Sequence, residues 1–260
     1  MATLTKDVLT VAGCNTCVRR GGQGRPVLIL HGAGGSGNLV NFATTLADHA
    51  DVILPDHPGF GESDLPVWLD NIHDAAYFYL DLLAALRIEQ ALVFGASLGG
   101  WIALEVAVRS TARIAGLVLS GAAGLNCAQA RRGDIFMWEP HERIRNMIHD
   151  QALAEKIIAL PQTSEQQGIA VKNEFATARL GWEPRFFDPS LHKWLHRIDV
   201  PTRIVWGEFD KVFPIPFGEN LRRHIPGASL EVIAACGHLP HVEKPEDLKR
   251  IVLAALGALS

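Results

Sequence analysis

The chain has 260 residues, of which 48% are hydrophobic and 20% are charged, and its net charge is −4. This length suits one large core, and an acidic balance without a long basic stripe argues against nucleic-acid binding. No apolar run reaches the length of a membrane span, and residues 1–7 lack the apolar region of a signal peptide. We therefore expect a cytoplasmic protein with no nucleic-acid or membrane partner.

Apolar runs alternate with helical patterns along the chain. An antiparallel hairpin over residues 8–11 and 16–19 is predicted to precede two buried strands at 27–30 and 51–55. The later predicted elements are a helix from about 72 to 86, a strand at 91–94, a helix at 98–109, strands at 114–120 and 201–207, a helix at about 216–224, a strand at 229–235 and a terminal helix from Pro245. This order predicts an α/β fold with a mostly parallel central sheet flanked by helices on both faces.

One segment, residues 125–197, interrupts the alternation. It has helical patterns and many aromatic residues but no convincing buried strand. In open α/β sheets, ligands bind at the carboxyl ends of the strands. We expect this segment to be a helical cap inserted over that edge, with residues 1–124 and 198–260 forming the core.

The most informative motif is Gly95-Ala96-Ser97-Leu98-Gly99, which matches G-x-S-x-G between a predicted strand and a predicted helix. In that context the serine lies on a sharp turn, and its hydroxyl projects from the sheet. The glycines let neighbouring backbone pass close to the turn. The N–H of Leu98, at a helix N-terminus, is suited to binding an oxyanion. The motif predicts Ser97 as a nucleophile.

A serine nucleophile needs a base within hydrogen-bond reach and a carboxylate that orients the base. His238 follows the last predicted strand and is the predicted base, with His241 as the main rival. Asp210 follows another strand and is the predicted acid, with Glu208 as its rival. Asp210 lies 28 residues before His238, which leaves room for one helix and one strand between neighbouring loops. The chain order Ser, Asp, His supports this assignment.

A glycine-rich loop, His31-Gly32-Ala33-Gly34-Gly35, follows an inner strand. It lacks the G-K-[ST] of a phosphate loop and the G-x-G-x-x-G of a dinucleotide site. Its backbone N–H groups are instead expected to face a substrate oxygen. We expect His31 to hold the loop by hydrogen bonds.

Two patterns, one of cysteines and one of histidines, resemble metal or redox sites, but we interpret both as structural. Cys14 and Cys17 form a C-x-x-C, but no second ligand pair stands at zinc spacing. His192 and His196 have i, i+4 spacing without an H-E-x-x-H context or a third ligand. We therefore expect no metal and no organic cofactor.

Together these motifs resemble those of the α/β-hydrolase superfamily, specifically its capped esterase-like and C–C-hydrolase-like members. The resemblance spans nearly the whole chain and rests on residues 31–34, 56–63, 95–100, 206–210 and 237–238. It implies a catalytic triad of Ser97, Asp210 and His238, oxyanion-hole N–H groups on Ala33 and Leu98, a cap at about 125–197, and a structural role for the loop 56–63.

The resemblance also narrows the reaction. Related epoxide hydrolases and haloalkane dehalogenases carry aspartate where this chain has Ser97. The C–C hydrolases often have tryptophan directly after the histidine, where this chain has Leu239. The leading expectation is a serine esterase that hydrolyses a small carboxylic ester through an acyl-enzyme. Hydrolysis of a C–C bond in a meta-cleavage-type diketone and a ligand-binding receptor on a hydrolase scaffold are the alternatives. The expected partner is a small-molecule substrate, and the oligomeric state stays open.

Overall fold

The computed structural model describes residues 3–259; residues 1, 2 and 260, which belong to the expected core, lie outside it. Eight strands form one sheet in the order β1-β2-β4-β3-β5-β6-β7-β8. The first two, β1 (Thr5–Val11) and β2 (Cys14–Gly21), form the expected antiparallel hairpin, and β2 pairs antiparallel with β4 (Asp51–Pro55). The parallel part of the sheet consists of β4 with β3 (Pro26–Leu30), β5 (Ala91–Ala96), β6 (Ile114–Ser120), β7 (Thr202–Gly207) and β8 (Ser229–Ile233).

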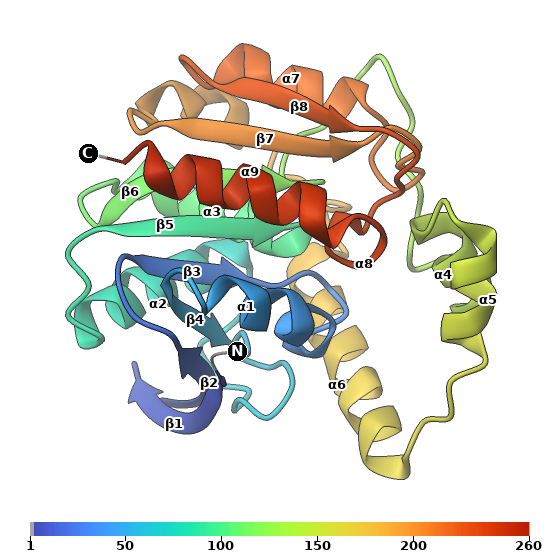
Figure 1. Cartoon of the computed structure of the whole chain (residues 1–260), viewed down its shortest axis with the longest axis horizontal. Helices are drawn as coiled ribbons and strands as arrows, with labels where there is room; N and C mark the ends of the chain where they lie inside the picture. Colours follow the sequence, from blue (N-terminus) through green and yellow to red (C-terminus); the bar gives the residue numbers. More distant parts are fainter. Residues whose placement is uncertain (1–2, 260) are drawn as a thin grey trace.

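Helices cover both faces of the sheet (Figure 1). On one face pack α1 (Val40–Leu46) and α9 (Pro245–Gly257); on the other pack α2 (Ile72–Ala85), α3 (Leu98–Arg109) and α7 (Pro216–His224). Strand β3 supplies both cores, because successive side chains of a strand point to opposite faces. Val27 and Ile29 pack with α1 and α9, whereas Leu28 and Leu30 pack with α2 and α3. The prediction of a mostly parallel sheet between helices is confirmed.

Two helices were not predicted. The first is α1, preceded by the 3₁₀ turn η1 (Ser36–Leu39), and the second is the short α8 (Pro240–Glu243). The sequence did carry a signal for α1, because buried Leu39, Phe42, Ala43 and Leu46 recur at helical spacing. The last strand ends at Ile233, two residues earlier than predicted.

Residues 125–197 form three helices, α4 (Pro140–Met147), α5 (Gln151–Ile158) and α6 (Ser164–Gly181), and two 3₁₀ turns, η2 (Leu191–Lys193) and η3 (Leu195–Arg197). In Figure 1, α4 and α5 lie on the side towards which the arrowheads of β7 and β8 point. No residue of α4 is buried, and α5 buries only Ala154. Helices α4 and α5 therefore lie beside the carboxyl edge of the sheet and contribute little to its cores, whereas Ala176 and Leu180 of α6 belong to one of them. Within residues 3–259, no helix combines the length and the apolar character that a membrane crossing requires.

Candidate active site

Ser97 lies on the turn between β5 and α3, with φ of 51° and ψ of −113°. Residues with a side chain adopt this conformation rarely, and it persists only where the surroundings enforce it. Close packing enforces it here: a Cβ on Gly99 would lie 2.1 Å from the Leu30 carbonyl oxygen, and one on Gly95 would lie 2.6 Å from the Gly99 oxygen. The two glycines therefore allow the turn that leaves the Ser97 hydroxyl half-buried at the edge of the sheet.

The structure joins Ser97, His238 and Asp210 in one hydrogen-bonded chain. His238 Nε2 lies 3.0 Å from Ser97 Oγ, and His238 Nδ1 lies 2.7 Å from Asp210 Oδ2. The other carboxylate oxygen accepts the N–H groups of Val212 and Phe213 at 2.8 and 2.9 Å. Because an ionised carboxylate can only accept, Nδ1 carries the imidazole proton. The lone pair on Nε2 then faces the serine hydroxyl, which is the tautomer that a general base requires.

Neighbouring parallel strands bring these groups together. Asp210 follows β7 and His238 follows β8, and the two strands pair directly. Their loops touch, since a Cβ on Gly207 would lie 1.9 Å from the Gly237 oxygen. After β6, Gly121 has φ of +52°, and a Cβ there would lie 3.1 Å from the His238 ring. The side chains of His238 and Asp210 are 1% and 0% exposed, so water scarcely reaches their hydrogen bond.

The rival residues take other places. Glu208 accepts the N–H of Ala235 at 2.9 Å. His241 is buried, and among the described residues its Nδ1 has no hydrogen-bond partner. Burial, and to a smaller extent nearby His238, lower the pKa of His241 to about 3, so it is neutral at pH 7. Neither rival belongs to the chain of hydrogen bonds that reaches Ser97.

Two peptide units beside Ser97 are fixed by bonds to their carbonyl groups. The Ser97 carbonyl accepts the N–H groups of Trp101 and Ala123, both at 3.1 Å. The Gly32 carbonyl accepts the N–H of Gly35 at 3.1 Å, and it lies 2.7 Å from His31 Nδ1. In a trans peptide, the C=O and the following N–H point in opposite directions. The bonds therefore fix the directions of the N–H groups of Leu98 and Ala33, the two expected oxyanion donors.

These two units are neighbours, because a Cβ on Gly32 would lie 3.4 Å from the Ser97 Cβ. Within residues 3–259, no protein acceptor is found for the N–H of Ala33 or of Leu98. Fixed donors of this kind can stabilise negative charge on a reacting carbonyl oxygen without first reorienting.

A stacked pair of histidines supports the glycine-rich loop. The rings of His31 and His57 have centroids 3.6 Å apart. His31 Nε2 accepts the N–H of His57 at 2.9 Å, so the proton lies on Nδ1, which donates to the Gly32 carbonyl. Burial lowers the pKa of His31 to about 4 and that of His57 well below its usual value. Both rings are neutral at pH 7, and the expectation that His31 holds the loop is confirmed.

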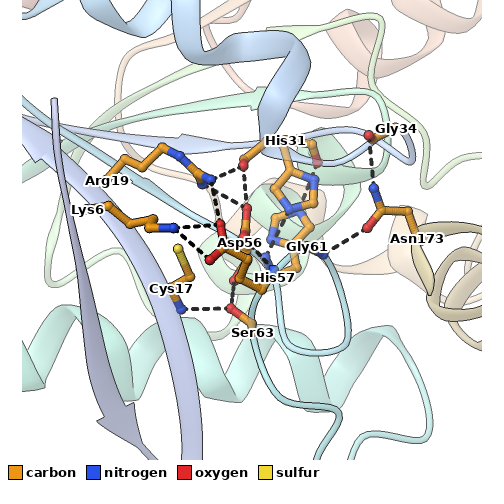
Figure 2. Close-up of polar contacts among 12 residues, drawn as sticks. Lys6, Cys17, Arg19, His31, Gly34, Asp56, His57, Gly61, Ser63 and Asn173 are labelled. Carbon is orange, nitrogen blue, oxygen red and sulfur yellow. Dashed lines mark hydrogen bonds and ion pairs between the residues drawn. The ribbon is translucent and has the colours of Figure 1, made fainter. Parts of the chain in front are cut away.

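The loop 56–63 lies beside the glycine-rich loop, as Figure 2 shows. The carboxylate of buried Asp56 accepts hydrogen bonds from the Arg19 guanidinium at 3.2 Å and from the N–H of Glu62 at 2.9 Å. It also accepts a hydrogen bond from the Ser36 hydroxyl. Ser63 Oγ accepts the N–H of Cys17 at 2.9 Å and donates to the Asp56 carbonyl at 2.8 Å. These bonds tie strands and loops together, in agreement with the structural role expected for this loop.

Sequence reasoning missed two polar groups that connect the helical segment to these loops. One is Asn173 of α6, which contacts the glycine-rich loop. The other is Glu243, whose carboxylate accepts the N–H groups of Gly237, His149 and Asp150 at 2.7, 2.8 and 3.0 Å. Glu243 therefore joins the loop before His238 to the turn between α4 and α5. Asn173 could have been noticed as a polar residue on the face of α6 that is buried. No local pattern marks Glu243.

The cysteines do not form a reactive site. Cys14 and Cys17 are free, buried and three positions apart in β2, so their side chains point to opposite faces of the sheet. Burial raises the pKa of Cys17 to about 11 and also raises that of Cys14. Both effects oppose the thiolate that metal binding or redox chemistry needs.

One group of possible metal ligands occurs among the described residues, namely His73, Glu105 and Asp188. The guanidinium of Arg109 already lies 2.6 Å from Glu105 Oε2 and 2.8 Å from His73 Nδ1. The cationic Arg109 side chain therefore occupies this cluster, and the cluster gives no reason to propose a metal site.

The chain is similar in sequence and in fold to known hydrolases. A family model described as the alpha/beta hydrolase fold matches residues 25–149 and 150–245. The 2-hydroxy-6-oxo-6-(2'-aminophenyl)hexa-2,4-dienoic acid hydrolase of Metapseudomonas resinovorans is 27% identical over 274 residues, which cover 95% of this chain and 89% of that protein. Two solved structures share the fold: a membrane phospholipase A (TM-score 0.82, 23% identity, 98% and 86% of the two chains) and a thermophilic esterase from Thermogutta terrifontis (0.76, 24%, 98% and 99%).

Proposed function

The chain belongs to the α/β-hydrolase fold family and is a hydrolase, and on that premise we propose that it is a serine hydrolase that cleaves a small carboxylic ester. The observation that carries this proposal is the chain of hydrogen bonds from Ser97 through His238 to Asp210. Ester hydrolysis needs a nucleophile, a base in the correct tautomer and an oxyanion site in one place. The N–H groups of Ala33 and Leu98 would supply the oxyanion site.

The proposed reaction has two halves. Ser97 Oγ attacks the ester carbonyl carbon while His238 Nε2 takes its proton, and the carbonyl oxygen becomes an oxyanion held by Ala33 and Leu98. The intermediate collapses, and His238 returns the proton to the departing alcohol, which leaves an acyl-enzyme. His238 then takes a proton from water, which attacks the acyl group, and gives that proton to Ser97 Oγ as the acid leaves. Asp210 stabilises the imidazolium in both halves.

We assign residues 125–197 to a cap and residues 1–124 and 198–260 to the core. Two sets of contacts support this division. Asn173 of α6 bonds to the glycine-rich loop, and the N–H of His238 donates to the carbonyl of Met147, at the end of α4, at 2.7 Å. The cap thus contacts the loops on both sides of Ser97, where it would shape the pocket for a small-molecule substrate.

The test is turnover of p-nitrophenyl acetate and butyrate. We expect Ser97→Ala to lower kcat by about 10⁴-fold or more, because nucleophile and base act as a unit. Ser120→Ala is the matched control, since Ser120 ends the neighbouring strand β6 and its buried hydroxyl has no hydrogen-bond partner among the described residues. Equal turnover by the wild type and Ser97→Ala would remove Ser97 from the mechanism. Stable ligand binding without product release would point instead to a receptor.

A second candidate reaction is hydrolysis of a C–C bond in a meta-cleavage-type diketone by the same residues. It is favoured by the relative from Metapseudomonas resinovorans, whose name describes a dienoic acid hydrolase. The ratio of kcat/KM for 2-hydroxy-6-oxo-6-phenylhexa-2,4-dienoate to that for p-nitrophenyl butyrate separates the two reactions. A ratio above about ten assigns C–C hydrolysis, because that corresponds to about 1.4 kcal/mol of additional transition-state stabilisation. A ratio below one assigns ester hydrolysis.

A further inference from the structure

Helix α6 buries two polar side chains beside the apolar Ala176 and Leu180, and it exposes two large apolar ones. Asn173 and Thr177, one helical turn apart, are 4% and 2% exposed. Val171 and Phe175, on the same helix, are 67% and 57% exposed. A helix placed by apolar burial alone would instead bury its large apolar side chains and expose its polar ones. Buried polar groups are retained where they form specific hydrogen bonds, so the partners of Asn173 and Thr177 help to set where α6 lies.

Those partners belong to loops of the candidate site. Asn173 Nδ2 donates to the Gly34 carbonyl at 3.1 Å, and Asn173 Oδ1 accepts the N–H of Gly61 at 2.8 Å (Figure 2). Thr177 Oγ1 donates more weakly to the Ala33 carbonyl at 3.3 Å. The acceptor bond to Gly61 fixes which end of the amide faces Gly34, since only a carbonyl oxygen can accept an N–H. One side chain therefore joins the cap helix to two loops of the core.

The bond to Gly34 acts on the oxyanion donor through two peptide units. The Gly34 carbonyl and the Gly35 N–H belong to the same planar peptide, and that N–H donates to the Gly32 carbonyl. The Gly32 carbonyl in turn shares a peptide with the N–H of Ala33. Rotation of the first peptide would break the bond that fixes the second. With three glycines in five residues, the loop has little conformational preference of its own.

Close packing shows that the loop is built around this side chain. Gly35 has φ of +88°, and a Cβ there would lie 2.5 Å from Asn173 Nδ2. The neighbouring Lys172 makes a contrasting set of contacts. Its Nζ donates to the carbonyls of Gly61 and Ser63 at 3.0 and 2.6 Å, and no hydrogen bond joins it to residues 31–35.

We propose that Asn173 is a positioning residue, which orients the Ala33 N–H for the oxyanion through the peptides of Gly34 and Gly32. This proposal rests on the proposed function, because it assumes that Ala33 stabilises an oxyanion formed by attack of Ser97. It makes the cap a determinant of the catalytic step as well as of the substrate pocket.

The experiment compares Asn173→Leu and Asn173→Asp with the matched control Lys172→Met. Leucine keeps the shape and removes both hydrogen bonds, whereas aspartate keeps an acceptor for Gly61 and places a negative charge against the Gly34 carbonyl. Lysine to methionine also removes two bonds from α6, but only those to the loop 56–63. The readouts are kcat and KM for p-nitrophenyl butyrate and the inhibition constant of an alkyl trifluoromethyl ketone, which forms a tetrahedral oxyanion on the serine.

We expect kcat to fall about tenfold to a hundredfold in both Asn173 variants, with KM changed less than about threefold, because a misplaced donor weakens only the transition state. The inhibition constant of the ketone should rise by the same factor as kcat/KM falls. We expect Lys172→Met to keep kcat within about threefold of wild type, although its melting temperature should fall as in Asn173→Leu.

Three results would overturn the proposal. The first is kcat near the wild-type value in Asn173→Asp; the second is an equal loss of kcat in Lys172→Met. The third is a failure of both Asn173 variants to fold, judged by far-UV circular dichroism, which would assign Asn173 a structural role. Failure of the proposed function would be recognised separately. In that case Ser97→Ala would keep its activity, and both Asn173 variants would have the kcat of the wild type.

Discussion

Helices α3 and α6 both border the candidate site, but different forces hold them in place. Every residue of α3 from Leu98 to Val108 is buried. Of the 18 residues of α6, five are buried, and two of those are Asn173 and Thr177. Apolar burial has no preferred direction and is large in sum, so it gives α3 its stability. Ala176 and Leu180 give α6 a small apolar contact with the core, and the directional hydrogen bonds of Asn173 and Thr177 add to it and favour one orientation.

This contrast separates stability from activity. Substitutions in the core should act first on the free energy of unfolding, because they change apolar burial. Substitutions at the polar connections between residues 125–197 and the rest of the chain should act first on turnover, because under the proposed function they change where the reacting groups lie. We expect the largest change in the free energy of unfolding from a substitution in the core, and the smallest from one on the exposed apolar face of α6.

In the core, Phe94 of β5 is fully buried and packs against Phe42 with ring centroids 5.6 Å apart. We expect Phe94→Ala to lower the free energy of unfolding by about 3–5 kcal/mol, because it removes a large apolar side chain and leaves a cavity. Urea denaturation followed by tryptophan fluorescence measures the change. A loss below about 1 kcal/mol would mean that the sheet does not depend on apolar packing at this point.

At the connection beside His238, we expect Glu243→Gln to lower kcat about tenfold and stability by about 1–3 kcal/mol. The glutamine keeps one acceptor oxygen, but an NH₂ group replaces the other. That NH₂ group cannot accept a hydrogen bond from the N–H of Gly237 or of His149. Glu246→Gln, on the exposed first turn of α9, is the matched control and should leave both quantities unchanged. If both variants keep wild-type kcat, the position of the His238 loop does not depend on Glu243.

Acid should destabilise the fold through the buried neutral histidines. Burial lowers the pKa of His31 to about 4 and that of His241 to about 3, while an unfolded histidine titrates near 6.5. Between these values the unfolded chain binds more protons, so each histidine removes up to about 1.4 kcal/mol of stability per pH unit as the pH falls.

His241 allows a clean measurement of this effect, because its buried Nδ1 has no hydrogen-bond partner among the described residues. We expect His241→Leu to lose stability less steeply than wild type between pH 6.5 and pH 4, as measured by urea midpoints at several pH values. Parallel stability curves for the two proteins would show that His241 takes up no proton on unfolding in this range.

The smallest effect is expected on the exposed face of α6. Phe175→Ala should change the free energy of unfolding by less than about 0.5 kcal/mol, because the side chain is 57% exposed. The same urea titration that is used for Phe94→Ala makes this a matched comparison of two phenylalanines. A loss as large as that of Phe94→Ala would mean that α6 is held by apolar burial after all.

Much of the core was predictable, and the reason lies in local chemistry. The strand at 27–30 is a continuous apolar run, the strands at 51–55 and 114–120 are mostly apolar, and the turn at Ser97 is marked by its glycines. The helix α1 was overlooked although its apolar residues recur at helical spacing. The path of residues 125–139, between β6 and α4, follows no periodic pattern, so only the structure reveals it.

By itself the sequence determined the alternation of strands and helices, the strained serine turn and the strand-end positions of Asp210 and His238. These features depend on periodicity and on glycine, which act within a few residues. Only the tertiary structure decided how residues 125–197 connect to the candidate site. Asn173 and Gly61 are 112 residues apart, and Glu243 and His149 are 94 residues apart. Their hydrogen bonds depend on the relative placement of whole elements, which no local pattern of residues encodes.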